Sequence, residues 1–231
     1  MKLKVKNGEW YKWVIISAGL FVGISVSQAA LIASYDLNGS SFAATTSDPD
    51  VSVSSIGTAG DWVISGSGGN LVITQNGADT IPTSTPDLAE YISFSVNPLS
   101  ETVNFSSIGF DFGGENNMVA TAYTLTVQLR SSVDGYAAVL GSDSRVIPAN
   151  TTVASLTSTS FDLSGVPSLQ SRTNTTQFRF YVYDNSTVTT KVLRARVDNI
   201  TVNGSVIPEP VTIGMLGLGS LIVLTLRRMR S

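Results

Sequence analysis

Residues 176–185 read TQFRFYVYDN, and their alternation decides the fold class of this chain. Apolar side chains recur at every second position, which is the period of a β-strand with one buried and one outward face. The pattern predicts an inward face of Phe178, Phe180 and Val182 and an outward face of Arg179, Tyr181 and Tyr183. We therefore predict a half-buried strand with two tyrosines on the same outward face.

The same period recurs through the middle of the chain. In YTLTVQLRSS (123–132) and LIASYDLNG (31–39) the apolar residues again share one parity. These inward positions are Tyr123, Leu125, Val127 and Leu129 in the first segment, and Leu31, Ala33, Tyr35 and Leu37 in the second. Further strands are predicted at 61–65, 70–75, 90–96, 107–112, 154–163 and 194–204.

Turn-forming residues separate the predicted strands, and no long helical pattern interrupts them. Glycine-rich, Asn-Gly and Asp-Gly turns stand at 66–69, 76–77, 134–135 and 203–204. Many short strands with polar turns are typical of a β-sandwich, so we predict an all-β domain of jelly-roll type over residues 30–206. A solenoid is the alternative, but the sequence shows no repeat of about 20–50 residues to support it.

The composition excludes several classes of site. The chain has no cysteine and no histidine, which excludes disulfides, thiolate chemistry, Ser-His-Asp hydrolysis and metal sites built on these residues. Between Ala30 and Ile207 there are seven Lys/Arg against fifteen Asp/Glu, which leaves a net charge of −8. A domain with this excess of acid is not expected to bind nucleic acid.

The first 29 residues have the three parts of an export signal. Four lysines precede an uncharged apolar run, Trp13 to Val26, which is short for a membrane span. Ser27 and Ala29 are the small residues of a signal-peptidase site, so cleavage before Ala30 is predicted, with the Sec machinery and signal peptidase as partners. A buried helix or a permanent anchor is the alternative interpretation.

A second membrane-directed segment closes the chain. Residues 211–226 read VTIGMLGLGSLIVLTL and carry no charge. As a helix they would span about 24 Å, slightly less than the roughly 30 Å hydrocarbon core of a bilayer. Arg227, Arg228 and Arg230 follow, and the positive-inside rule keeps them in the cytoplasm, so the domain is predicted to face outward. The alternative is a hydrophobic helix docked on a soluble domain.

Pro208, Glu209 and Pro210 stand directly before this run. Each proline removes a backbone N–H and favours extended structure in its predecessor, which keeps the triplet unwound for a processing enzyme. The triplet, the span, the arginines and the export signal together resemble the PEP-CTERM sorting signal of Gram-negative bacteria. The resemblance covers about the last 25 residues (207–231). It implies recognition by an exosortase, a membrane cysteine peptidase or transpeptidase, in bacteria that produce exopolysaccharide and form biofilms.

The last predicted strand changes phase at Asp198-Asn199. Apolar residues take one parity before this point and the other parity after it, namely Leu193, Ala195 and Val197, then Ile200 and Val202. A β-bulge at Asp198-Asn199 would return both sets to the core.

The segment RVDNITVNG (196–204), taken with the opening LIASYDLNG, resembles the ends of secreted bacterial jelly-roll domains of the carbohydrate-binding or lectin type. In several such families two acidic residues at these places bind a structural calcium, which implies Asp36 and Asp198 as ligands here. Calcium needs six to eight oxygens, more than two carboxylates supply. The alternative interpretation is that both carboxylates accept hydrogen bonds from nearby backbone N–H groups.

Aromatic side chains are the candidates for ligand binding, because the C–H faces of sugar rings stack on flat rings in shallow clefts. Trp62 is the one tryptophan after the signal, and Tyr181 and Tyr183 share an outward face. Further candidates are Tyr91, Tyr123 and Tyr136. The alternative for each of them is a place in the core.

These observations predict a non-enzymatic, exported protein. The C-terminal helix would hold it in the inner membrane in transit to the cell surface or extracellular matrix, where exopolysaccharide is the expected ligand. No cofactor other than the calcium is expected. One alternative is a secreted polysaccharide-active enzyme that uses Asp111 and Glu115 of GFDFGGENN as an acid–base pair. The other is a structural surface protein that binds no ligand.

Overall fold

The computed structural model of the chain describes its middle part, where the regular structure is β apart from two short 3-10 turns, η1 (Ser132–Asp134) and η2 (Pro167–Leu169). The described residues are 29–37, 41–67, 70–75, 81, 84–116, 121–151, 156–185 and 193–207. Ser27, both predicted terminal helices, the triplet at 208–210 and the arginine tail lie outside them. No helix among the described residues is long and apolar enough to cross a membrane.

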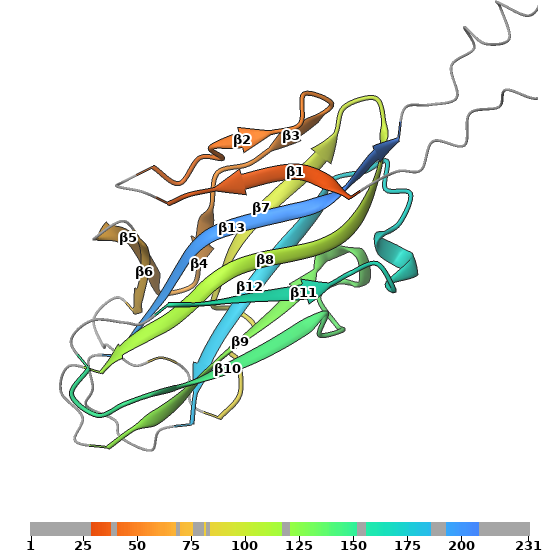
Figure 1. Cartoon of the computed structure of the whole chain (residues 1–231). Coiled ribbons are helices and arrows are strands. Elements are labelled where there is room, and N and C mark those ends of the chain that lie inside the picture. Colours follow the sequence, from red (N-terminus) through yellow and green to blue (C-terminus); the bar gives the residue numbers. More distant parts are fainter. Residues whose placement is uncertain are drawn as a thin grey trace, which may run out of the picture.

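Two antiparallel sheets form a sandwich, which confirms the predicted all-β class (Figure 1). Sheet A contains β1 (Ala30–Tyr35), β2 (Thr46–Ser47), β5 (Trp62–Ser67), β6 (Asn70–Gln75), β8 (Thr102–Asn116), β11 (Thr157–Asp162) and β13 (Leu193–Ile207). Sheet B contains β3 (Val51–Val53), β4 (Gly57–Ala59), β7 (Tyr91–Pro98), β9 (Tyr123–Ser131), β10 (Gly141–Ile147) and β12 (Thr176–Asp184).

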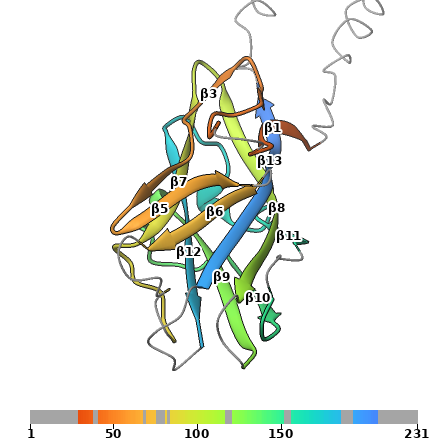
Figure 2. The same cartoon turned by 90° about the vertical axis from the view of Figure 1, so that its left-hand side faces the viewer.

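The order of the strands places the longest ones at the centre of each layer. Sheet A runs β11-β8-β13-β1-β2, with β6 also paired to β13 and β5 paired to β6. Sheet B runs β10-β9-β12-β7-β3, with β4 also paired to β7. In Figure 2, β8 and β13 lie on one side of the sandwich and β7 and β12 on the other.

Phenylalanines from both sheets join the two layers. Phe105 of β8 meets Phe178 of β12 edge to face at 5.1 Å between ring centroids, and Phe110 of β8 meets Phe180 of β12 at 5.0 Å. All four rings are buried. Each such pair adds about 0.5–1.5 kcal/mol to the stabilisation that burial gives. Because one strand supplies each side, these contacts fix how β8 and β12 are aligned.

Most of the predicted alternation is present. All the inward residues predicted for 123–132 are buried, and so are Phe178, Phe180 and Val182. The prediction for Leu31 is wrong: this side chain is 43% exposed, whereas Ile32 is 1% exposed. The reason is an irregularity in the pairing of β1 with β13 between Leu31 and Ala33, which turns Ile32 inward beside Ala33.

Four strands were not predicted from the sequence, namely β2, β3, β4 and β10. The first three have only two or three residues each, too few to show a period. The fourth, β10, reads GSDSRVI and pairs with β9 over its whole length at the edge of sheet B. Its apolar residues are too few for a pattern, since an edge strand buries less of its surface.

The predicted bulge in the last strand is confirmed. The pairing of β13 with β8 shifts between Asp198 and Thr201, and Asn199 takes a left-handed φ of 48°. Ala195 and Val197 before the shift and Ile200 and Val202 after it are all fully buried. One extra residue therefore keeps a strand with a change of parity on a single core.

The predicted turn at Asn203-Gly204 is wrong, because both residues lie within β13. The pairing with β8 shifts a second time between them. A Cβ at Gly204 would clash with the backbone oxygen of Asn104 and would meet Cδ1 of Ile32 at 2.6 Å. Glycine is needed here because β8 and the buried Ile32 side chain both approach too closely for a side chain.

The first and last described strands lie side by side. Ala30 pairs with Gly204, so the start of β1 lies beside the end of β13, as Figure 1 shows. The chain therefore enters and leaves the sandwich at the same end.

Gly204→Ala is expected to destabilise the domain by roughly 1–3 kcal/mol, because the added methyl group must displace backbone or a packed side chain. Thermal unfolding followed by circular dichroism measures this, at about 2–4 °C in Tm per kcal/mol for a domain of this size. Gly57→Ala is the matched control, since a Cβ at that strand position meets nothing within 4 Å. Equal Tm values for the two variants would contradict the packing argument.

Candidate functional site

The outer face of sheet B carries a connected group of aromatic and polar side chains. The alternation of its strands turns one set of residues inward and the other outward. The outward set includes Tyr91 of β7; Thr126, Gln128 and Arg130 of β9; Ser144 of β10; and Gln177, Arg179, Tyr181 and Tyr183 of β12. We call this surface the sheet B outer face.

Arg179 is held between two tyrosine rings at the centre of this face. Its guanidinium carbon lies 3.8 Å from the ring centroid of Tyr91 and 3.5 Å from that of Tyr136. Its Nε donates a hydrogen bond to Oε1 of Gln177 at 3.0 Å. A guanidinium stacked on aromatic faces in this way is fixed in plane and orientation before any ligand arrives.

Tyr136 reaches Arg179 from the loop between β9 and β10. Gly135 and Tyr136 both take left-handed φ angles, 69° and 65°, and the Tyr136 N–H donates to the carbonyl of Ser131 at 2.9 Å. A left-handed φ at a tyrosine is uncommon and has an energetic cost. This conformation folds the loop back, so that the Tyr136 hydroxyl donates to Oε1 of Gln177 at 2.6 Å. Burial raises the pKa of this phenol, and the charge of Arg179 opposes the rise.

Arg130 and Tyr181 extend the cluster beneath this stack. Tyr181 is only 1% exposed and meets Tyr91 edge to face at 5.8 Å, while the Arg130 guanidinium lies 5.6 Å from its ring centroid. Nη1 of Arg130 donates to the carbonyl of Tyr136 at 3.0 Å, which ties the loop to the sheet. Tyr181 therefore supports the surface from below and has little of its own ring to offer a ligand.

A chain of hydrogen bonds continues the face towards β10. Arg130 donates to Oε1 of Gln128 at 3.1 Å, and Nε2 of Gln128 donates to the hydroxyl of Tyr183 at 3.1 Å. The hydroxyls of Thr126 and Ser144 share a further bond of 2.9 Å. Tyr183 is half-buried, so its ring is partly open to solvent.

Trp62 and Tyr123 do not belong to this face. Trp62 is 4% exposed, and its indole Nε1 donates to Oε2 of the buried Glu90 at 2.8 Å. Tyr123 lies in the core, where its hydroxyl donates to the backbone oxygen of Glu115 at 2.9 Å and burial raises its pKa. Of the aromatic residues named from the sequence, the structure brings together Tyr91, Tyr136, Tyr181 and Tyr183.

The outer face of sheet A is acidic. Asp198 of β13 pairs in register with Asp111 of β8, and the pKa of Asp198 is raised by burial and by the charges of Asp111 and Asp36. Oδ1 of Asp198 accepts a hydrogen bond from the backbone N–H of Asn199 at 2.8 Å. Asp111 accepts from Ser158 at 2.5 Å and from Asn199 at 2.8 Å.

The charge of Asp36 contributes to the raised pKa of Asp198, so the two predicted calcium ligands lie close enough to interact electrostatically. The described residues nevertheless contain no group of three or more acidic side chains arranged to hold a metal ion. The backbone hydrogen bond of Asp198 fits the alternative interpretation of a bulge carboxylate. Calcium binding at this pair remains a prediction.

The geometry separates the two carboxylates named for catalysis. Asp111 and Glu115 stand four residues apart in β8, which corresponds to about 13 Å along a strand, against about 5–9.5 Å for the two carboxylates of a glycosidase. Glu115 is 2% exposed and forms ion pairs with Arg196 and, at 3.7 Å, with Arg194. Its surroundings are those of a structural ion pair, and the two residues do not form an acid–base pair.

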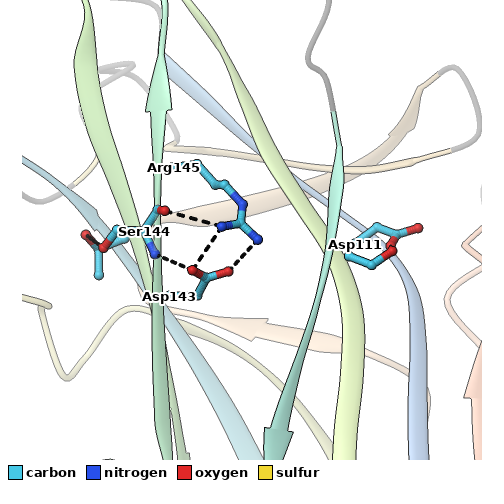
Figure 3. Close-up of polar contacts among 6 residues, drawn as sticks. Asp111, Asp143, Ser144 and Arg145 are labelled. Atoms are coloured by element: carbon cyan, nitrogen blue, oxygen red, sulfur yellow. Dashed lines mark hydrogen bonds and ion pairs between the residues drawn. The ribbon is translucent and has the colours of Figure 1, made fainter.

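A third ion pair lies at the edge of the sandwich. Nη2 of Arg145 lies 2.7 Å from Oδ2 of Asp143, two residues earlier in β10 (Figure 3). Both side chains take the inward parity of this edge strand, on the same side as the buried Ile147. Figure 3 shows no contact between this pair and Asp111. Arg145 therefore has its own counter-charge and takes no part in the sheet B outer face.

Sequence reasoning missed the polar half of the site. Gln128, Arg130 and Gln177 were not singled out, and Arg179 was placed on the outward face without a role. The alternation carries enough signal to place all four outward once the strands are known. It cannot show that a loop tyrosine lies over Arg179, because that contact joins segments 43 residues apart (136 and 179).

No protein-family model matches this chain, and no curated protein matches it. Among solved structures it is similar to a family 29 carbohydrate-binding module, with 11% identity, 76% of this chain and 89% of the other covered, and a TM-score of 0.37. The module TmCBM27, studied for mannan recognition, is 10% identical, with 77% of this chain and 99% of the other covered and a TM-score of 0.43. The N-terminal cellulose-binding domain of Cellulomonas fimi β-1,4-glucanase C is 10% identical, with 62% of this chain and 82% of the other covered and a TM-score of 0.34. All three TM-scores are below 0.5, so the case for a ligand depends on this chain's own side chains.

Asp198→Asn is expected to stabilise the domain at neutral pH by roughly 0.2–1 kcal/mol, because it removes a like charge opposite Asp111. A raised folded-state pKa means that the folded protein binds a proton more tightly than the unfolded chain. The carboxyl group of Asp198 therefore destabilises the fold as pH rises through that pKa, and the gain in the variant should vanish below the ordinary value of 3.8. Chemical denaturation of both proteins across this pH range, in EDTA, measures the effect.

The same pair of proteins tests calcium. If Asp36 and Asp198 hold the ion, added calcium should raise the Tm of the unaltered protein and leave that of Asp198→Asn unchanged. If calcium shifts neither Tm, the two carboxylates are not its ligands.

Proposed function

We propose that this chain is a non-enzymatic, exported protein whose sheet B outer face binds a carbohydrate. The observation that supports the proposal most is the stack of Tyr91, Arg179 and Tyr136 on an open sheet surface. Sugar rings offer apolar C–H faces to aromatic rings and hydroxyls to polar groups. This surface supplies both, with half-buried tyrosines next to the amides of Gln128 and Gln177.

The stiffness of the surface also favours binding. Hydrogen bonds join Gln177, Tyr136, Arg130 and Gln128 into one network, so few side chains would have to be ordered when a ligand arrives. Surfaces ordered in advance lose less conformational entropy on binding. A purely structural sandwich has no need of a strained loop that places a tyrosine over an arginine.

An enzyme is the less favoured alternative. The acid–base pair considered from the sequence, Asp111 and Glu115, is too far apart on one strand, and Glu115 is engaged by Arg194 and Arg196. In addition, neither residue lies on the sheet B outer face. We therefore infer a binding role for that face and assign no reaction to the domain.

The route by which the protein reaches its ligand is proposed from the two ends of the sequence. The export signal would be cleaved before Ala30, and the helix at 211–226 would hold the protein in the inner membrane. An exosortase would then recognise Pro208, Glu209 and Pro210. Delivery to the cell surface or the extracellular matrix, in contact with exopolysaccharide, is the proposed result. Ala30 pairs with Gly204, so both tags would join the domain at the same end of the sandwich.

Tyr136→Ala should weaken carbohydrate binding about 3- to 10-fold, since it removes one ring of the stack. Tyr136→Phe keeps the ring and loses only the hydrogen bonds of the hydroxyl, to Gln177 and Arg179, so its affinity should stay within about 2-fold. Binding of the full chain in mild detergent to a panel of soluble polysaccharides, measured by calorimetry, tests this. Ser160→Ala, on the exposed edge strand β11 of sheet A, is the control and should change nothing.

Failure of the unaltered protein to bind any polysaccharide in the panel would favour the structural protein without a ligand. Equal loss of binding in Tyr136→Ala and Ser160→Ala would place the binding surface elsewhere.

Replacing Pro208, Glu209 and Pro210 together with alanines is expected to leave the protein uncleaved in the inner membrane. The reason is that alanines would extend the predicted helix at 211–226 and remove the extended segment that a peptidase is proposed to bind. Immunoblots of membrane, surface and medium fractions follow both size and location. Substitution of three exposed residues in the preceding domain, Ser52, Ser142 and Ser160, with alanine is the control. Unchanged processing of the triplet variant would rule out the sorting signal.

A further inference from the structure

We infer that the preferred ligand of the sheet B outer face is an acidic glycan, whose sugar carboxylates bind the edge of the Arg179 guanidinium. This inference rests on the proposed function, because it names the class of carbohydrate for the same face. It comes from the distribution of charge over the sandwich and from the packing around Arg179.

The two outer faces of the sandwich differ in charge. Sheet A carries Asp36, Asp111 and Asp198 close together on its outside. The described strands of sheet B turn no carboxylate outward, and their outward charges are Arg130 and Arg179. In a domain with a net charge of −8, a face of this kind is a local exception, and it attracts anions.

Two arginines stand directly opposite each other on this face. Arg179 of β12 pairs in register with Arg130 of β9. Like charges at directly opposite positions destabilise a sheet. Within the described residues no ion pair joins either of them to a carboxylate, whereas Arg145, Arg194 and Arg196 each have one. An anion bound beside Arg179 would relieve this repulsion.

The packing around Arg179 leaves one direction for such an anion. The rings of Tyr91 and Tyr136 cover both faces of the guanidinium, and its Nε is bonded to Gln177. What remains for an anion is the edge that bears the terminal nitrogens, beside the Tyr136 hydroxyl, which forms a side-chain hydrogen bond with Arg179. A carboxylate binds this edge with two parallel hydrogen bonds, whereas a neutral hydroxyl makes a weaker single bond. The flanking tyrosines would meet the C–H groups of the same sugar.

Arg130 has a different part in the cluster. Its terminal nitrogens are used in hydrogen bonds to the carbonyls of Tyr136 and Ala137 and to Gln128. It supplies positive charge and holds the loop in place, and it is not expected to contact the ligand. Arg179 is thus the specificity-determining residue in this inference.

The test compares polygalacturonate with its fully methyl-esterified form, which has the same backbone without the charge. Alginate and hyaluronate serve as further acidic polymers, mannan and a soluble β-glucan as neutral ones, and dextran sulfate as a non-carboxylate polyanion. The full chain in mild detergent is titrated by calorimetry. We expect an acidic glycan to bind about 10- to 100-fold more tightly than its neutral counterpart, and its affinity to fall as NaCl is raised.

Arg179→Gln should abolish the preference, measured as the ratio of the affinities for the acidic and the esterified polymer, because it removes the charge-assisted bonds. It also removes the stack on Tyr91 and Tyr136, so the affinity for neutral polymers is expected to fall as well. Arg179→Lys keeps the charge without the planar fork and should retain part of the preference. Arg172→Gln is the matched control, because it removes one positive charge from a residue that lies outside the aromatic cluster. Thermal unfolding shows whether each variant is folded. If Arg179→Gln does not fold, Arg179→Lys and the salt titration of the unaltered protein test the acidic preference instead.

The outcomes separate the two levels of the proposal. Equal affinity for the acidic and esterified polymers, or binding of neutral polymers alone, overturns the acidic preference and leaves carbohydrate binding intact. Equal weakening by Arg179→Gln and Arg172→Gln, or equally tight binding of dextran sulfate, shows diffuse charge and overturns the role of Arg179. No binding to any polymer overturns both this inference and the proposed function.

Discussion

The contact between β8 and β12 across the sandwich is the constraint on which the rest of the structure depends. Phe105 packs on Phe178 and Phe110 on Phe180, each pair edge to face. Once these phenylalanines face the core, the alternation of a strand leaves no choice for the residues between them. Arg179 and Tyr181 must face outward, on the surface where Tyr91 and Tyr136 meet them. Burial of the core therefore also builds the candidate binding face.

The two register shifts in β13 of sheet A also contribute to the packing of this core. The bulge after Asp198 returns Ile200 and Val202 to the interior, and the second shift at Gly204 lets β13 lie close to β8. The first of these irregularities leaves Asp198 beside other carboxylates on the outside. Sheet A thus collects negative charge on its outer face, whereas the strands of sheet B turn only arginines outward among their charged residues.

The arrangement of the termini relates the domain to the proposed route. Because Ala30 and Gly204 are partners in one ladder, the segments before β1 and after β13 attach at a single end. A protein carried by its tail can then present either outer face to its surroundings. In our proposal, the sheet B outer face, with its arginine and tyrosines, is the face that meets a polymer with both apolar sugar rings and charge.

The sequence by itself determined the features that depend on neighbouring residues. The period of two identified β9 and β12 and their inward residues, and the change of parity identified the bulge at Asp198-Asn199. The absence of cysteine and histidine limited the chemistry that the chain can perform, whatever its fold. These conclusions hold because strand alternation and side-chain chemistry are local properties of the chain.

Only the tertiary structure decided what depends on segments far apart in the chain. It turned Ile32 inward instead of Leu31, and it placed Gly204 within a strand, because both positions are set by how β13 pairs with its neighbours. It buried Trp62 against Glu90, which removed the most conspicuous aromatic residue from the candidate site. It also brought Tyr136 over Arg179. Pairing, burial and stacking between distant segments are fixed by the packing of the whole sandwich, and no local pattern in the sequence records them.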